Sequence, residues 1–131
     1  MIKLLVVDDE LEICEFLETF FAERGFRVLV AHNGKEALRV IESEGPAIVL
    51  LDIKMPVMDG MTALKEIKKN GSSCRVVMIS GIDDPETITE ARRYGASEYL
   101  VKPVLLDRLE ELVLGMAQDI GNNVTPGRLD A

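Results

Sequence analysis

Long apolar runs are absent from this sequence, and with them the usual marks of a membrane or exported protein. No stretch approaches the ~20 consecutive apolar residues of a membrane-spanning helix. The opening MIKLLVVDDE has an apolar run too short for the core of a signal peptide, and acidic residues follow it directly. We therefore expect a cytoplasmic protein without a membrane partner.

Positive charge is also scarce. The chain has 15 Lys and Arg against 23 Asp and Glu, so its formal net charge is −8. Proteins that bind nucleic acids or anionic membranes use clustered Lys and Arg to neutralise phosphates. This composition therefore disfavours direct binding of nucleic acid.

Cysteine and proline are few as well. The two cysteines, Cys14 and Cys74, lie in no CxxC or Cys/His cluster, so neither redox nor zinc chemistry is indicated, and we expect two reduced structural thiols. With 5 Pro and 47% hydrophobic residues among 131, the composition is that of one folded globular domain rather than of a disordered segment.

What the sequence does contain is a regular alternation of strand and helix patterns. Short unbroken apolar runs are typical of strands buried on both faces of a parallel sheet. They predict strands at 2–7, 26–31, 47–51, 75–80 and 97–101. Apolar residues at helical spacing predict helices from Glu10 to Gly25, from Asn33 to Gly45, from Gly60 to Asn70, from Pro85 to about Tyr94 and from Leu105 to about Gly121.

This order of elements predicts the fold class. Five strand-helix units without hairpins form a doubly wound parallel sheet with helices on both faces. We expect a flavodoxin-like (βα)5 α/β fold with strand order 2-1-3-4-5.

Polar side chains follow four of these strands, at the edge of the sheet where ligands bind in such folds. Asp8 and Asp9 follow the first strand, Asp52 follows the third, Ser80 ends the fourth and Lys102 follows the fifth. In the predicted order the first and third strands are neighbours, so the three carboxylates converge and repel one another. A hard cation such as Mg²⁺ or Mn²⁺ is therefore expected among them.

Each of these residues also has a purely structural interpretation. Asp8 or Asp9 could cap the following helix, although a cap accounts for one carboxylate and not for the second. Asp52 could mark an ordinary strand exit, Lys102 could be a solvated strand end, and hydroxyls such as that of Ser80 are common there. Their coincidence at one edge is what favours a functional site.

A set of short motifs at the strand ends is more specific. The motifs are Asp8-Asp9, Asp52 followed by Met55-Pro56 and Asp59-Gly60, Ser80-Gly81, Tyr99, and Lys102-Pro103. Over residues 2 to about 120 the sequence resembles the receiver domain of bacterial two-component response regulators. The resemblance implies phosphorelay signal transduction, with a sensor histidine kinase or a histidine phosphotransfer protein as the partner that donates the phosphoryl group.

The resemblance also implies a role for each site residue. Asp52 would be the phosphoacceptor, and Lys102 and Ser80 would hold phosphoryl oxygens. The ligands of Mg²⁺ would be Asp9, Asp52, the backbone carbonyl of Lys54 and, through water, Asp8. The Lys102–Pro103 peptide bond would be cis. Such a domain catalyses only its own phosphorylation and dephosphorylation, so it is not an enzyme in the usual sense.

The output step that the resemblance implies starts at Ser80. Its hydroxyl would move toward the phosphoryl group and Tyr99 would follow. The face formed by residues 85–94, 97–101 and 105–121 would then change and contact a downstream effector domain or protein. We expect residues 1–121 to form the receiver domain and residues 122–131 to be a polar tail or the start of a linker.

Lys54 and Ile82 occupy positions that vary in this family. Each lies two residues after a site residue, where its side chain flanks the path of the water that attacks the phosphoryl group. We expect these two side chains to tune the lifetime of the phosphorylated form.

Three other functions stay open from the sequence. A phosphohydrolase with an aspartate nucleophile would carry Asp-x-Asp where this chain has Asp8-Asp9-Glu10, and it would have a cap domain. A flavodoxin is disfavoured because the acidic loop after the first strand would repel a flavin phosphate. A receiver-like module that binds partners without phosphorylation would have lost site residues, and none is lost here.

Overall fold

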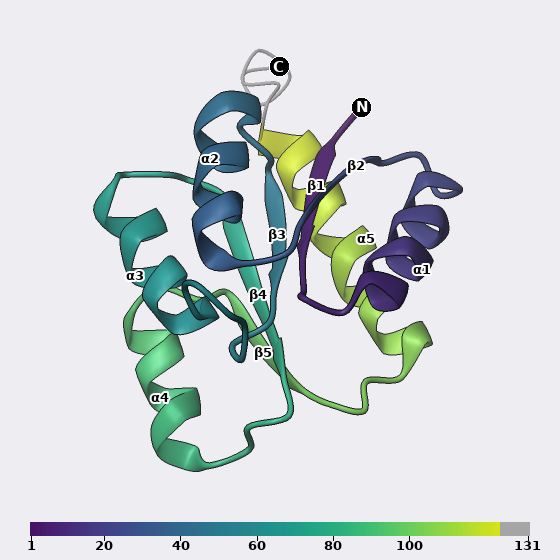
Figure 1. The fold of residues 1–131 in the computed structure, drawn as a ribbon. Coiled ribbons are helices and arrows are strands. Elements are labelled where there is room, and N and C mark those ends of the chain that lie inside the picture. Colours follow the sequence, from purple (N-terminus) through teal and green to yellow (C-terminus); the bar gives the residue numbers. More distant parts are fainter. Residues whose placement is uncertain (124–131) are drawn as a thin grey trace.

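Five apolar runs form one parallel sheet in the computed structural model, which describes residues 1–123 (Figure 1). The strands are β1 (Lys3–Val7), β2 (Arg27–Ala31), β3 (Ile48–Leu51), β4 (Arg75–Ser80) and β5 (Glu98–Val101). Their order, β2-β1-β3-β4-β5, is the one predicted, and every neighbouring pair is parallel. The flavodoxin-like fold class is therefore confirmed.

The helices of the described residues lie on both faces of this sheet. They are α1 (Leu11–Ala22), α2 (Gly34–Glu44), α3 (Gly60–Lys69), α4 (Pro85–Arg93) and α5 (Leu106–Asn123). Figure 1 shows α1 and α5 on one side of the strands and α2, α3 and α4 on the other. No helix within residues 1–123 has both the length and the apolar character needed to cross a membrane.

Successive strand residues point to opposite faces and build two cores. Leu4 and Val6 of β1 pack with the buried residues of α1 and α5, whereas Leu5 and Val7 pack with those of α2, α3 and α4. Each of these four side chains is at most 1% exposed. For β1 and for β3, which is buried throughout, a strand that is apolar on both faces is therefore the correct interpretation of the unbroken run.

The ends of the elements follow local chemistry, with small departures from prediction. Asn33 caps α2 by accepting a hydrogen bond from the backbone N–H of Glu36 at 2.8 Å, and Asp84 caps α4 through the N–H of Thr87 at 2.9 Å. Four strands start one residue later than predicted. Helix α5 continues through Gly121 to Asn123, two residues into the predicted tail of residues 122–131. The rest of that tail, residues 124–131, lies outside the described residues.

The start of α1 corrects one expectation. The helix begins at Leu11 rather than Glu10, since the backbone of Glu10 is extended (φ −84°, ψ 110°) and its side chain makes no capping bond. Asp8 Oδ1 accepts a hydrogen bond from the N–H of Glu10 at 2.9 Å, in the turn before the helix. The acidic pair therefore does not cap α1.

Candidate functional site

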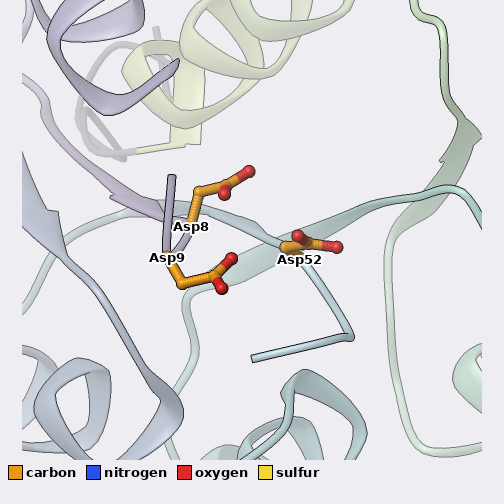
Figure 2. A group of neighbouring side chains, drawn as sticks. All are labelled: Asp8, Asp9 and Asp52. Atoms are coloured by element: carbon orange, nitrogen blue, oxygen red, sulfur yellow. The ribbon is translucent and has the colours of Figure 1, made fainter. Parts of the chain in front are cut away.

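Three carboxylates meet where β1 and β3 end. Val7 lies opposite Leu51 in the pairing of these strands, so the residues that follow them leave the sheet side by side. Asp8, Asp9 and Asp52 each offer an oxygen within 4.8 Å of the others, and Figure 2 shows the three side chains gathered there. Asp8 is 5% exposed and Asp52 is 7% exposed, whereas Asp9 is open to solvent.

Lys102 brings a positive charge to this group. It follows β5, and its ammonium Nζ lies 3.3 Å from Asp8 Oδ2 and 3.3 Å from Asp52 Oδ2. The Lys102–Pro103 peptide bond is cis, as the resemblance implied. Burial opposes the charge of Lys102, but Asp52 and Asp8 together outweigh it, so the pKa of Lys102 is raised. The ammonium is therefore held in its charged form between two carboxylates.

Asp52 is held firmly by its surroundings. Its Oδ1 accepts a hydrogen bond from the backbone N–H of Ile53 at 2.7 Å. Burial raises the pKa of Asp52, the ammonium of Lys102 lowers it, and the charge of Asp8 raises it again, with a net upward shift. Asp52 is thus oriented by one backbone hydrogen bond and one ammonium contact.

Gly60 allows the main chain to approach Asp52. Any side chain at Gly60 would collide with the carbonyl oxygen of Asp52, and the N–H of Gly60 donates to the carbonyl of Ile53 at 2.7 Å. The first residue of α3 therefore lies directly against the chain that leaves β3. The sequence motif contained this glycine, but only the packing shows why no other residue fits.

A crevice opens between these strand ends. Its walls are Asp9, Glu10, Asp52, Lys54, Ser80, Gly81, Ile82, Asp83 and Lys102. Except for Asp8, which lies deeper, and Tyr99, these walls include every site residue that the sequence singled out. The lifetime positions, Lys54 and Ile82, thus face the same space as Asp52.

Ser80 and Tyr99 meet at the backbone of Ile82, a link that the sequence did not reveal. Ser80 is 1% exposed, and its Oγ accepts a hydrogen bond from the N–H of Ile82 at 3.1 Å. The hydroxyl of Tyr99 donates to the carbonyl oxygen of Ile82 at 2.7 Å. Burial raises the pKa of Tyr99, so its hydroxyl stays protonated and remains a donor. The two side chains therefore bind the two peptide groups on either side of Ile82, and movement of either disturbs the backbone of this residue.

The acidic group suits a hard divalent cation. Asp8 and Asp52 are both buried and share one ammonium, that of Lys102, so the three carboxylates retain an excess of negative charge. At an effective dielectric of about 20, two carboxylates about 5 Å apart repel by roughly 3 kcal/mol. Oxygen donors of this kind are the ligands that Mg²⁺ and Mn²⁺ prefer.

The fold and the crevice together define a class of protein. A buried, lysine-paired aspartate beside a cation site, at the carboxyl edge of a doubly wound sheet, has the parts needed to receive a phosphoryl group. The family comparison agrees, because a model of the response regulator receiver domain matches residues 4–114. The chain belongs to this family.

Relatives of known name and structure support the assignment. Regulatory protein AtoC of Escherichia coli K12 is 40% identical over 111 residues, which are 85% of this chain and 24% of AtoC. Chemotaxis protein CheY of Bacillus subtilis 168 is 35% identical over 112 residues, 85% of this chain and 93% of CheY. A chain in the crystal structure of the CheX–CheY–BeF3–Mg²⁺ complex from Borrelia burgdorferi is 31% identical with a TM-score of 0.81, covering 87% of each chain.

These relatives differ in length. The chain spans about a quarter of AtoC and of the ZraR proteins that it also matches, but nearly all of B. subtilis CheY. What is common to them is a regulatory phosphoacceptor domain. This chain is such a domain, and its function is phosphorelay signalling. The comparisons do not favour the phosphohydrolase or the non-phosphorylated binding module.

Proposed function

We propose that Asp52 is the phosphoacceptor of this receiver domain. Its oxygen attacks the phosphorus of a phosphohistidine, the P–N bond breaks, and the imidazole leaves as the aspartyl phosphate forms. The observation that carries the proposal is the position of Asp52. It is only 7% exposed, lies beside the acidic pair and is 3.3 Å from the ammonium of Lys102. The donor is a sensor histidine kinase or a histidine phosphotransfer protein.

The same proposal assigns the metal ligands. Asp9, Asp52 and the backbone carbonyl of Lys54 would hold Mg²⁺, with Asp8 acting through water, and Mn²⁺ is an alternative ion. The bound cation supplies neutralisation of the phosphoryl oxygens. The support is the carboxylate group within 4.8 Å and the presence of Lys54 in the crevice wall. Mg²⁺ is also present in the Borrelia burgdorferi complex.

Lys102 and Ser80 are proposed to bind the phosphoryl oxygens. Lys102 now contacts Asp52 Oδ2, and this ammonium can stay in place when that carboxylate is phosphorylated. Ser80 Oγ now accepts a hydrogen bond from the N–H of Ile82, and its own hydroxyl group can donate a hydrogen bond to a phosphoryl oxygen. Positioning and charge neutralisation are what phosphoryl transfer demands of a protein.

Output is proposed to run through Ser80 and Tyr99 to the α4-β5-α5 face. The support is that Ser80 binds the N–H and Tyr99 the carbonyl oxygen of Ile82, three residues before α4 begins. This face would contact a downstream effector domain or protein. We further propose that residues 1–121 are the receiver domain and that residues 122–131 are a polar tail or the start of a linker, into which α5 extends as far as Asn123. We also propose that the protein acts in the cytoplasm and catalyses no reaction beyond its own phosphorylation and dephosphorylation.

A small phosphodonor tests this proposal without a kinase. Incubation with acetyl phosphate and Mg²⁺ should add one phosphoryl group that is stable in mild acid and labile in base, as an acyl phosphate is. Intact-mass measurement should show that the Asp52→Asn variant gains none. Labelling that survives in the variant would place the chemistry on another residue and reopen the hydrolase interpretation.

A further inference from the structure

Gly34, the first residue of α2, touches the loop that carries Lys54. Its N–H donates a hydrogen bond to the carbonyl oxygen of Met58 at 2.9 Å. A Cβ at this position would lie 2.7 Å from that oxygen and 2.8 Å from Met58 Cγ, both closer than real Cβ atoms come. The start of α2 therefore packs against the loop so tightly that only glycine fits without a shift of Met58.

The loop needs this support because its own conformation is strained. Val57 has a positive φ of 69°, which is rare for a β-branched residue. Its side chain is 77% exposed, so no packing of Val57 offsets the strain. Three backbone hydrogen bonds hold the loop in this conformation. The N–H of Met58 donates to the carbonyl of Pro56 across Val57 at 2.7 Å, Gly34 donates to Met58, and Gly60 donates to Ile53.

The segment that contains Gly34 also reaches the acidic pair. Nδ1 of His32 lies 3.2 Å from the carbonyl oxygen of Asp8, and the N–H of Asp8 donates to the carbonyl of Ala31 at 3.1 Å. Residues 31–34 thus contact both halves of the site: the end of β1 and the loop after β3. None of their side chains lines the crevice itself.

We propose that Gly34 is a positioning residue for the metal site. Its tight contact with Met58 sets the path of the loop and hence the place of the Lys54 carbonyl relative to Asp9 and Asp52. The inference rests on the proposed metal ligands and extends them to a residue that touches no ligand. Groups that hydrogen-bond directly to metal ligands typically alter metal affinity by about 10–100-fold when changed, and a residue one contact further away should have a smaller effect.

The Gly34→Ala variant tests this with Mg²⁺ alone as the probe. Calorimetric titration should show a Kd for Mg²⁺ several-fold above that of the native chain, an effect smaller than the about 10–100-fold that loss of a direct partner of a metal ligand causes. Gly115→Ala is the matched control, because Gly115 is also a helical glycine and a Cβ there meets nothing within 4 Å. Its Kd should be unchanged. Far-UV circular dichroism checks that both variants are folded at the titration temperature.

The outcomes separate this inference from the proposed function. A native chain that binds no Mg²⁺ overturns the metal site and the inference with it. Normal binding by the native chain together with a Gly34→Ala Kd within twofold of it overturns the inference alone. A lower melting temperature with an unchanged Kd would make Gly34 structural only.

Amide hydrogen exchange on the native chain decides the matter if Gly34→Ala does not fold. If the hydrogen bond from Gly34 to Met58 and the metal site are coupled, binding of Mg²⁺ must strengthen that hydrogen bond in return. Saturating Mg²⁺ should therefore slow exchange of the Gly34 amide. The Gly45 amide is the control, since it donates to Ile41 at the other end of the same helix. Equal effects at both amides, or none at Gly34, would overturn the proposal.

Discussion

At the scale of single residues, the site holds buried charges that would each destabilise the fold without a partner of opposite charge. Two buried carboxylates, Asp8 and Asp52, share the ammonium of Lys102, and burial raises the pKa of Asp52 despite that contact. The site therefore has a strong electrostatic preference for a further cation. A side chain beside these charged groups can contribute a further charge to the site, or it can exclude water from the site.

Lys54 and Ile82 are predicted to exclude water from the site. Hydrolysis of an aspartyl phosphate needs a water aligned opposite the leaving oxygen of Asp52, and both side chains line that crevice. Ile82 offers no hydrogen bond to such a water, and the long side chain of Lys54 occupies its space. We expect the Lys54→Asn, Ile82→Glu double variant to lose its phosphoryl group several-fold faster than the native chain.

Decay should be followed by intact mass or phosphate-affinity gel after each protein is freed of phosphodonor. A cationic Lys54 could also stabilise the charge of the transition state. We expect occlusion to be the larger effect, since the proposed metal and Lys102 would already neutralise the phosphoryl oxygens and a second ammonium would add little. Equal or slower decay in the double variant would make Lys54 a surface charge that faces the kinase.

Val57 gives a stability prediction at the same scale. Its left-handed backbone should cost about 1–2 kcal/mol, whereas asparagine tolerates this conformation. Val57→Asn should therefore raise the unfolding free energy by about 1 kcal/mol and the melting temperature by about 3–5 °C. Val101→Asn, an exposed position within β5, should lower it. A Val57→Asn melting temperature at or below that of the native chain would remove the strain argument.

At the scale of elements, α4 is the least anchored helix of the sheet. Ala91 is its one buried residue, so its start depends heavily on the Asp84 cap. Asp84 Oδ1 accepts from the N–H of Thr87 and Oδ2 from its hydroxyl, at 2.9 and 2.7 Å. A helix with so little buried surface opens easily, which suits an element that has to rearrange.

The cap makes the first turn of α4 sensitive to acid. The hydrogen bonds from Thr87 lower the pKa of Asp84, so the cap contributes stability above the ordinary pKa of Asp, about 3.9, and loses it as the pH falls through the lowered value. At neutral pH, Asp84→Ala should speed amide exchange at Thr87. This difference from the native chain should shrink in acid.

Asn33→Ala supplies the matched control, because it removes the uncharged cap of α2. Its effect on the Glu36 amide should not vary over the same pH range. If the effect of Asp84→Ala were as constant as that of Asn33→Ala, ionisation of Asp84 would not matter to α4.

At the scale of the whole molecule, Mg²⁺ should stabilise the fold. It relieves repulsion among Asp8, Asp9 and Asp52, and binding to the folded state alone adds about 2.7 kcal/mol at 100 times the Kd. Thermal melts with and without the ion should differ by several degrees. The Asp9→Ala variant should show a clearly smaller shift, and an equal shift would contradict the proposed metal site.

Much of the fold was predictable from local patterns. Each unbroken apolar run became a strand within a residue of its predicted limits, since a run such as 48–51 has no polar face to leave in solvent. Asn33 and Gly45 mark the ends of α2 as expected. Helix limits were less certain at Glu10 and Gly121, where an acidic residue and a glycine are each compatible with both states.

The sequence by itself determined the strand order, the edge of the sheet that holds the site, and the identity of the acidic and lysine side chains there. These follow from short-range periodicity and from the topology that five strand-helix units must adopt. Only the tertiary structure decided that Ser80 and Tyr99 both bind the backbone of Ile82 and that Gly34 contacts Met58. Such contacts join segments far apart in the chain, and their geometry depends on how closely whole elements pack, which no local pattern encodes.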